Sequence, residues 1–408
     1  MDTYYETALT LTSQFYFCGL PLRLDSYSYC SYGCRYCFAK HRGGNFRQPL
    51  LKMASPRALE RWFMLAEGKP EPTESILVEF LRQRVPIHFG GMTDPFPTFE
   101  RKLRVSLGLL EVLEHFNYPV VISTKSRIVA ETKYLDILRR MKYRIVQISL
   151  SCLSEDFTRA VERNTPSPET RLTVMKTLAE AGVPVFCRIQ PYFPSEGDST
   201  LRLIDRLSNN GCRHVAVEHL KLPVERRGSL FNDLSKALGV DPWEMYRRQG
   251  AGRSGREWVL PGDVKKRNLQ PLMEAIRTAG MTFGAADNEL QYLSDTHCCC
   301  SGVDQIRGFE RFFRHQIGYA IREARDRNEI RYSCIAKEWC PKASPDRFLN
   351  SNIRHARVGA KATMAEYIRR KWNSPGTQNA PSSWLGVQTA ERQDSSGDTI
   401  YSWESGGD

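Results

Sequence analysis

The chain has 408 residues, of which 41% are hydrophobic and 25% are charged, and its formal net charge is +12. This length suffices for a large α/β domain with appendages, and the composition is that of a globular protein. Its twelve cysteines do not form the pattern of a small secreted disulfide framework. The N-terminus lacks the basic and apolar regions of a signal peptide, and no apolar run of about 18 residues predicts a membrane span. We therefore expect a cytoplasmic protein with reduced thiols.

The charge is unevenly distributed along the chain. From residue 375 onward there are five acids and one base, so the body before this point carries +16. A basic body suits an anionic partner such as nucleic acid, although ordinary surface solubility accounts for it equally well. Residues 374–408 are rich in Ser, Gly, Gln, Pro and acids, a composition that predicts a disordered tail.

The chain between these ends alternates short apolar strand patterns with helical patterns. An N-terminal extension covers residues 1–19. Strands are then predicted at 20–29, 86–91, 119–124, 144–151, 184–192 and 214–219, with helices at 56–67, 100–116, 133–139, 169–181 and 201–209. Strands and helices that alternate through short connections argue for a parallel sheet, so residues 20–220 predict an α/β fold, a partial (β/α)6 barrel. The chemistry of such barrels lies at the C-terminal ends of the strands.

Residues 221–373 are less regular, and we predict that they form a substrate-binding or auxiliary region. Residues 221–268 interleave Arg and Lys with Trp243, Tyr246 and Trp258, an arrangement that can contact phosphates and stack bases. A helix at 270–279, a final strand at 281–286 and an amphipathic helix at 304–327 are predicted to follow.

Three cysteines with the spacing C-x3-C-x2-C, namely Cys30, Cys34 and Cys37, follow the first predicted strand, and Phe38 comes next. A 4Fe–4S cluster normally takes four thiolates, so three local ligands would leave one iron open for a small molecule. The alternatives are three unrelated buried thiols or a zinc knuckle. A closed zinc site needs a fourth Cys or His at similar spacing, and only His41 is near.

This motif resembles the signature of the radical S-adenosylmethionine (SAM) enzymes. Two further stretches resemble the spore photoproduct lyase branch of that superfamily: GGMTDPFPTFERKLRVSLGLLEVL…YPVVISTKS within 90–126, and QISLSC…ERNTPSPETRLTVMKTLAEAGVPVFCRIQPYFP within 147–194. The resemblance covers roughly residues 20–220. It implies a 4Fe–4S cluster on Cys30, Cys34 and Cys37, reductive cleavage of SAM to a 5′-deoxyadenosyl radical, and an electron donor such as flavodoxin or ferredoxin.

The resemblance also implies a set of SAM-binding residues at the strand ends. They are Phe38, Gly90, Gly91, Thr93, Asp94, Lys125, Ser149, Arg188 and Gln190, to which period two on one strand adds Ser151. The carboxylate of SAM needs Lys or Arg, and its ribose hydroxyls need Ser, Thr, Asp or Gln. Taken singly, the glycines also suit a plain turn, and Lys125 and Arg188 also suit a solvated surface. Tyr36 matches a lyase tyrosine near the cluster and is one candidate for a catalytic residue, which the sequence does not identify.

Gly91 marks a departure from the lyase pattern. The lyase has a cysteine at this position, which returns a hydrogen atom to the product radical, and no cysteine lies nearby in this sequence. We therefore do not expect a spore photoproduct lyase itself. The substrate radical is expected to rearrange, to add, or to be re-reduced by 5′-deoxyadenosine.

A second group of cysteines lies in the C-terminal third, beside His297: Cys298, Cys299, Cys300, Cys334 and Cys340. Candidate occupants are an auxiliary iron–sulfur cluster or zinc. The spacing matches no auxiliary-cluster pattern, and the alternative is a set of buried small hydrophobic side chains.

Three functions are compatible with these patterns. The first is modification or rearrangement of a nucleic-acid base, a modified pyrimidine in DNA, which would have to leave a duplex to be reached. The second is modification of a peptide or protein, with an auxiliary cluster binding the substrate. The third is a non-catalytic, metal-bound protein that binds nucleic acid.

Overall fold

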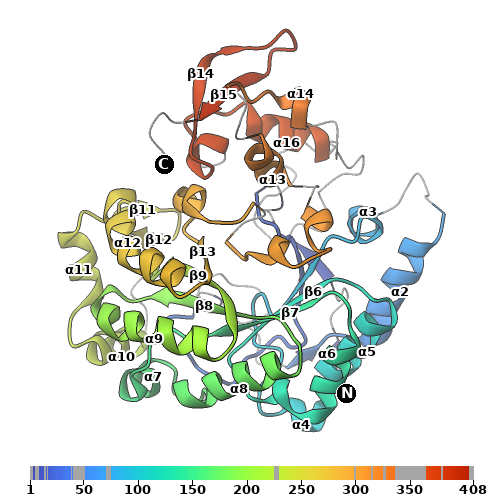
Figure 1. Ribbon diagram of the computed structural model, residues 1–408, viewed down its shortest axis with the longest axis vertical. Helices are drawn as coiled ribbons and strands as arrows, with labels where there is room; N and C mark the ends of the chain where they lie inside the picture. Colours follow the sequence, from blue (N-terminus) through green and yellow to red (C-terminus); the bar gives the residue numbers. More distant parts are fainter. Residues whose placement is uncertain are drawn as a thin grey trace.

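The protein is described by a computed structural model that covers residues 3–4, 9–12, 15, 17–37, 39, 51–69, 75–224, 229–297, 300–313, 316–324, 328–335, 364–377 and 380–403. Within these residues the central feature is an eight-stranded sheet with the order β13-β9-β8-β7-β6-β5-β3-β2 (Figure 1). Neighbouring strands are parallel throughout, except for the antiparallel pair β2–β3. The predicted α/β fold, a partial barrel of parallel strands, is confirmed.

The strands of this sheet are short and strongly apolar. They are β2 (Leu9–Leu11), β3 (Leu22–Leu24), β5 (Ile87–Phe89), β6 (Val120–Thr124), β7 (Arg144–Ser149), β8 (Val185–Tyr192), β9 (Cys212–His219) and β13 (Thr282–Ala285). All five residues of β6 are buried, which is typical of a parallel strand covered on both faces. The final strand predicted at 281–286 forms as β13, so the sheet extends beyond residues 20–220 on both sides.

Helices pack on the outer face of the sheet and connect its strands (Figure 1). They are α2 (Pro56–Glu67), α3 (Ile76–Arg82), α4 (Glu100–Leu103), α5 (Val105–His115), α6 (Thr132–Arg140), α7 (Glu155–Val161), α8 (Pro168–Glu180), α9 (Gly197–Asn209) and α12 (Gly262–Thr278). Local sequence sets their starts: Ser167 caps α8 by accepting from the Thr170 amide, and Pro168 occupies the first turn, where no amide is needed.

The inside of the barrel is filled by a segment from the C-terminal third. This segment contains the 3₁₀ turns η5 (Val303–Gln305) and η6 (Glu310–Phe313), followed by α13 (Ile317–Glu323). Its side chains Val303, Phe309, Phe312 and Phe313 pack against Val121, Ile145 and Phe186 of the central strands. The prediction of a single amphipathic helix at 304–327 is therefore wrong. Gly308, at φ +86°, interrupts the helix, and the aromatic side chains are held by the barrel instead.

The prediction of a disordered tail is wrong for residues 380–403. This part of the chain forms η7 (Pro381–Ser383) and an antiparallel hairpin of β14 (Val387–Gln393) and β15 (Thr399–Trp403). The hairpin packs against α16 (Met364–Trp372): the Trp372 indole donates to the Thr399 carbonyl at 2.7 Å, and the Tyr401 hydroxyl donates to the Trp372 carbonyl at 2.6 Å. Several polar residues of this segment are exposed, whereas Asp398 is buried and its Oδ1 accepts from Arg369 Nε and Asn373 Nδ2, both at 2.6 Å.

This C-terminal unit contacts chain segments beside both edges of the open barrel. The ring of Trp384 lies 5.1 Å from that of Phe17, which follows edge strand β2. At the other edge, Gly386 packs so closely on Tyr292, after β13, that a Cβ at residue 386 would lie 2.6 Å from the Tyr292 Cβ. The unit thus spans the side on which the sheet does not close, with α13 between it and the barrel (Figure 1).

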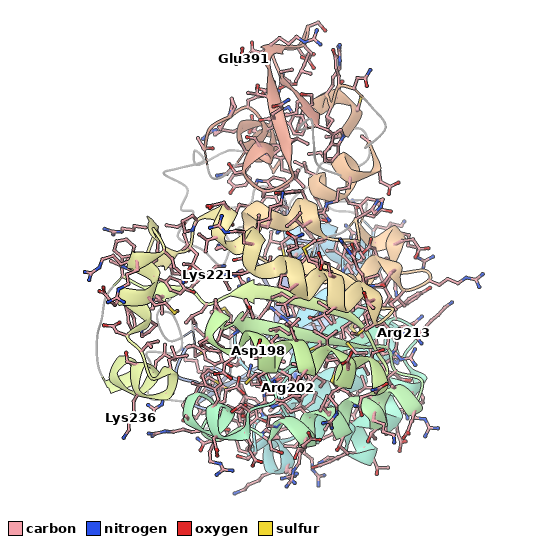
Figure 2. The ribbon with its side chains drawn as sticks, turned by 60° about the vertical axis from the view of Figure 1, so that its left-hand side comes forward. Asp198, Arg202, Arg213, Lys221, Lys236 and Glu391 are labelled. Atoms are coloured by element: carbon pink, nitrogen blue, oxygen red, sulfur yellow. The ribbon has the colours of Figure 1, made fainter. Side chains whose placement is uncertain are left out.

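An insertion between β9 and α12 forms a small antiparallel sheet beside the barrel. It contains β10 (Leu222–Pro223), α10 (Ser229–Leu238), α11 (Pro242–Arg248), β11 (Gly252–Ser254) and β12 (Glu257–Val259). Trp243 and Tyr246 are buried in its core, so the prediction that they stack bases is wrong, while Trp258 is partly exposed. Figure 2 shows Lys221, next to this insertion, and Arg213 at opposite ends of β9.

Among the described helices, none is long and apolar enough to cross a membrane.

Candidate functional site

A cavity opens at the carboxyl ends of the parallel strands, where barrel chemistry is expected. Most residues that the sequence implied meet there. Those that line the cavity are Cys30, Cys34, Tyr36, Cys37, Gly90, Gly91, Thr93, Asp94, Lys125, Ser149, Arg188 and Gln190. Ser151 is buried outside the lining, and its carbonyl accepts from the Thr200 hydroxyl at 3.2 Å. Phe38 lies outside the described residues.

The cysteine loop is held by the end of α7 and the turn that follows it. The Arg35 amide donates to the Val161 carbonyl at 2.8 Å, and the Asn164 side-chain amide donates to the Ser31 carbonyl at 3.0 Å. Within the loop, Gly33 adopts φ +65°, a left-handed conformation that glycine accepts readily. These contacts turn the side chains of Cys30, Cys34 and Cys37 toward one cavity.

The chemistry of this cysteine set fits an iron–sulfur cluster. Burial raises the pKa of the Cys30 thiol to about 12 and raises that of Cys34 as well, so both thiols need a bound cation to become thiolates. No three His, Cys, Asp or Glu side chains in the described chain converge as ligands of one metal ion. A cubane cluster does not require such convergence, because each thiolate binds a different iron.

The turn after β5 is organised by a carboxylate that the sequence did not single out. Asp25 Oδ1, at the end of β3, accepts from the Met92 and Thr93 amides at 2.8 and 3.0 Å. The Thr93 hydroxyl donates to the Tyr27 carbonyl at 2.9 Å. Thr93 therefore ties two strand ends together, and its hydroxyl is engaged within the protein. Short strands separated by about 60 residues give no sequence signal for such a contact.

Asp94 connects the turn after β5 to the end of β6. Its carboxylate accepts from the Lys125 amide at 2.6 Å, the Thr124 hydroxyl at 2.7 Å and the Phe96 amide at 2.9 Å. Burial raises the pKa of this carboxyl, while these donors act to lower it. The geometry makes Asp94 a residue that positions Lys125 in the cavity wall.

We predict that Gly90→Ala disrupts this turn. Gly90 has φ +91°, and a Cβ there would lie 2.5 Å from the Ser123 carbonyl oxygen. The backbone conformation alone costs about 1–3 kcal/mol for a residue other than glycine, and the clash adds to that cost. Gly91→Ala is the matched control, because the three atoms nearest to its Cβ, from 3.1 Å, all belong to the flexible Arg23 side chain. Chemical denaturation should show a much larger loss of stability for Gly90→Ala than for Gly91→Ala. Equal losses of stability in the two variants would contradict this account.

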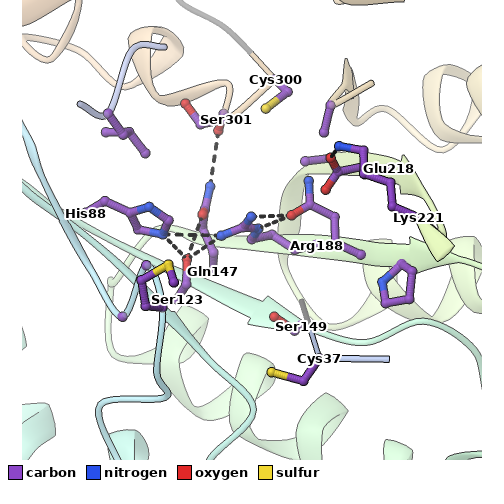
Figure 3. A pocket seen from close by; sticks show the side chains of 18 of the residues that line it. Cys37, His88, Ser123, Gln147, Ser149, Arg188, Glu218, Lys221, Cys300 and Ser301 are labelled. Carbon is purple, nitrogen blue, oxygen red and sulfur yellow. Dashed lines mark hydrogen bonds and ion pairs between the residues drawn. The ribbon is translucent and has the colours of Figure 1, made fainter. Parts of the chain in front are cut away.

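A polar network that includes Arg188 lies at the centre of the cavity (Figure 3). Arg188 Nη1 donates to Ser123 Oγ at 2.9 Å and lies 3.2 Å from His88 Nε2, while its Nε donates to Gln190 Oε1 at 2.7 Å. The Ser123 hydroxyl in turn donates to Gln147 Oε1 at 3.1 Å. The network fixes a guanidinium in the cavity, where it can meet an anionic group of a ligand.

Sequence reasoning missed His88, Ser123 and Gln147, although a signal for them exists. Gln147 lies two residues before Ser149 on β7, so the two side chains point to the same face; His88 and Ser123 lie on β5 and β6, each two residues before an implied site residue in the turn after the strand. The alternation that links Ser151 to Ser149 also places Gln147 on that face, and the position of His88 and Ser123 near the carboxyl ends of their strands is the signal for the other two.

The opposite wall of the cavity comes from β9, the insertion and the chain after β13, and none of its residues was predicted. It contributes Glu218, Lys221, Glu257, Asn288 and Gln291. Lys221 and Glu218 form an ion pair, and both point into the space seen in Figure 3. The predicted strands at 214–219 and 281–286 end beside this wall, but the barrel predicted over residues 20–220 does not include the second of them.

A buried ionic network lies directly behind this wall. The His219 ring donates to Asp287 Oδ2 at 2.7 Å, and Lys265 Nζ donates to Asp287 Oδ1 at 2.9 Å. Burial acts to raise the pKa of the Asp287 carboxyl, but His219, Lys265 and Lys221 together hold it below its usual value. Asp287 is thus an anion at neutral pH, and it fixes the end of β9.

The second cysteine group is only partly described. Cys300 lines the cavity beside Ser301, whereas Cys334 is exposed on α14 (Tyr332–Ile335), and no described contact joins the two. His297 pairs with Glu323 at 2.6 Å. Cys298, Cys299 and Cys340 lie outside the described residues. An auxiliary cluster or zinc site at this group stays a prediction.

Comparisons with known proteins agree with this arrangement. A sequence profile of the radical SAM superfamily matches residues 25–208. An uncharacterized protein of Mycobacterium tuberculosis is 24% identical over 283 residues, covering 64% of this chain and 77% of that protein. An uncharacterized protein of Methanocaldococcus jannaschii is 21% identical over 176 residues, covering 43% and 62% respectively.

Solved structures of spore photoproduct lyase have a similar fold. A variant with a tyrosine replaced by phenylalanine gives a TM-score of 0.51 at 14% identity, covering 69% of this chain and 80% of that one. A variant with a cysteine replaced by alanine, bound to a dinucleoside spore photoproduct, gives 0.50 at 14% identity, covering 68% and 77%. At this identity the likeness concerns the fold.

Proposed function

We propose that this chain, which belongs to the radical SAM superfamily, uses its radical chemistry on a nucleic-acid base. The family implies a 4Fe–4S cluster and SAM, which when bound supply a 5′-deoxyadenosyl radical able to take hydrogen from a substrate C–H bond. Membership of this enzyme superfamily argues against the non-catalytic alternative. The proposal therefore concerns the substrate class and the residues that bind the cofactors.

The residues in the cavity suit both cofactors. Cys30, Cys34 and Cys37 would hold the cluster. Lys125 and Arg188 supply cations for the carboxylate of SAM, and Ser149 and Gln190 supply hydrogen-bonding groups for its ribose hydroxyls. The apolar segment that fills the barrel beneath them, including Val303 and Phe309, excludes water from that side.

The main support for a nucleic-acid substrate comes from two exposed arginines on the hairpin of β11 and β12. Glu257 of this hairpin lines the cavity, while Arg253 and Arg256 near its turn are exposed. Neither arginine forms an ion pair with a carboxylate in the part of the chain that the structure describes. A phosphate backbone bound by these two arginines would run beside the cavity opening and bring a base within reach of it.

The polar lining of the cavity supports the same substrate class. Gln147, Asn288 and Gln291 offer amide donors and acceptors of the kind that recognise base edges. A base in a duplex would have to be flipped out to reach them. A spore photoproduct lyase variant of similar fold is described in complex with a dinucleoside spore photoproduct, which adds support for a nucleic-acid substrate.

The double variant Arg253→Ala/Arg256→Ala tests this proposal. We expect weaker binding to DNA and a slope of log K against log salt that is smaller by about 0.9 for each lost phosphate contact. DNA should also raise the production of 5′-deoxyadenosine by the wild-type protein and should do so less in the variant.

The matched control is Arg247→Ala/Arg248→Ala on α11. It removes the same charge, but both of these arginines pair with Glu244. If both double variants lost DNA affinity equally, the weaker binding would be due to net charge alone. An absence of wild-type binding to DNA at low salt, where phosphate contacts are strongest, would contradict the proposal.

A further inference from the structure

A buried carboxylate, Glu162, lies next to the cysteine loop. It follows α7, and its side chain is 3% exposed. It accepts hydrogen bonds from the Tyr36 hydroxyl and from Arg171 Nη2, and it lies 3.9 Å from Lys125 Nζ. One carboxylate therefore joins a residue of the cysteine loop to two cations.

The partner cation Arg171 is itself fixed from all sides. Its side chain is 1% exposed, its Nη1 donates to the Ser149 carbonyl at 2.9 Å, and its Nε donates to the Pro166 carbonyl at 2.9 Å. Because the guanidinium is anchored to backbone at the end of β7, it holds Glu162 in one place. Glu162 in turn holds Tyr36, which lies between the cysteines Cys34 and Cys37.

The charges of this group act directly on the cysteine loop. Glu162 binds the Tyr36 hydroxyl within the loop, and its carboxylate lies 3.9 Å from Lys125 Nζ. Replacing Glu162 by a neutral residue removes a negative charge from this buried group, beside Lys125 and Arg171. Charges in such a buried site are weakly screened, so this difference changes the electrostatic potential at any group bound to the cysteines.

We infer that Glu162 is a positioning residue that sets the reduction potential of the cluster held by Cys30, Cys34 and Cys37. A nearby negative charge makes the addition of an electron less favourable, so Glu162 lowers the potential. A reduced cluster of lower potential is a stronger donor of the electron that SAM cleavage consumes. The carboxylate thus has an electrostatic role in addition to tethering Tyr36.

The test is Glu162→Gln in the full chain, with the cluster reconstituted under anaerobic conditions. Glutamine keeps the side-chain length and an oxygen acceptor for Tyr36, but removes the charge. We expect the midpoint potential, measured by a redox titration followed by electron paramagnetic resonance, to shift in the positive direction. Glu162→Asp, which keeps the charge, should stay near the wild-type value. Lys125→Gln removes the opposing charge and should shift the potential in the negative direction.

Glu155→Gln is the control for a general change in charge. Glu155 lies on the same helix α7, but it is exposed and pairs with Arg159 at the surface. An unchanged potential in Glu162→Gln, or an equal shift in Glu155→Gln, would overturn the inference. Loss of the cluster in both Glu162→Gln and Glu162→Asp would also overturn it, because Glu162 would then only hold the loop. The measurement needs no substrate, so its outcome is independent of whether the enzyme acts on nucleic acid.

Discussion

Cys34→Ala is expected to abolish both the bound iron and the production of 5′-deoxyadenosine. Cys34 is the middle member of the cysteine set, and its side chain faces the same cavity as those of Cys30 and Cys37. A 4Fe–4S cluster with one iron left open for SAM has only three protein thiolates, so the loss of one leaves two. Iron should fall from about four per chain, the content of one such cluster, toward zero.

Iron and sulfide analysis of anaerobically reconstituted protein measures this outcome directly. Cys334→Ala is the control, since Cys334 is exposed on α14 and lies outside the cavity lining. About four irons per chain in both the wild type and Cys334→Ala would also leave Cys334 without a role in a second cluster. Full iron content and undiminished 5′-deoxyadenosine production in Cys34→Ala would contradict the assignment of the cluster.

The sequence predicted the part of the site that depends on strand ends. Gly90, Lys125 and Ser149 each follow or end an apolar strand pattern, Arg188 lies within one, and parallel strands bring their carboxyl ends to one edge. This argument needs only the order and direction of the strands. It places residues in the cavity without knowledge of any side-chain contact, which is why it succeeded for widely separated positions.

Other parts of the site depend on contacts between distant segments that leave no local pattern. Asp25 binds the amides of the turn after β5, and Glu162 binds Tyr36 across 126 positions of the chain. Both are single carboxylates in stretches whose periodicity is set by other residues. The wall formed by Asn288 and Gln291 was missed for another reason: it depends on β13, which joins the sheet after a long insertion.

The C-terminal hairpin shows why composition was misleading. A two-stranded hairpin is marginal by itself, so its sequence need not have the strong apolar pattern of a central strand. Val387, Ile400 and Tyr401 are buried, while the exposed residues of this segment, such as Gln388, Arg392 and Ser395, are polar. The average composition of the segment therefore resembles that of a disordered tail, although a few large side chains pack it firmly against the rest of the fold.

Trp384→Ala is expected to destabilise the protein by about 3–5 kcal/mol, the usual cost of truncating a buried aromatic side chain. Trp384 is 2% exposed, and its ring packs 5.1 Å from that of Phe17, which lines the cavity. The substitution leaves a void between the C-terminal unit and the segment that follows edge strand β2. We therefore expect a lower midpoint of urea denaturation together with greater exposure of the cavity wall near Phe17.

Gln388→Ala on β14 is the matched control, because Gln388 is exposed on the same hairpin. It should change the midpoint little, since surface substitutions usually stay within about 0.5 kcal/mol. Similar small changes in both variants would show that the hairpin contributes little to stability, as a disordered tail would. A large loss in Trp384→Ala alone would instead make the hairpin an integral part of the fold, because it covers the side on which the eight-stranded sheet remains open.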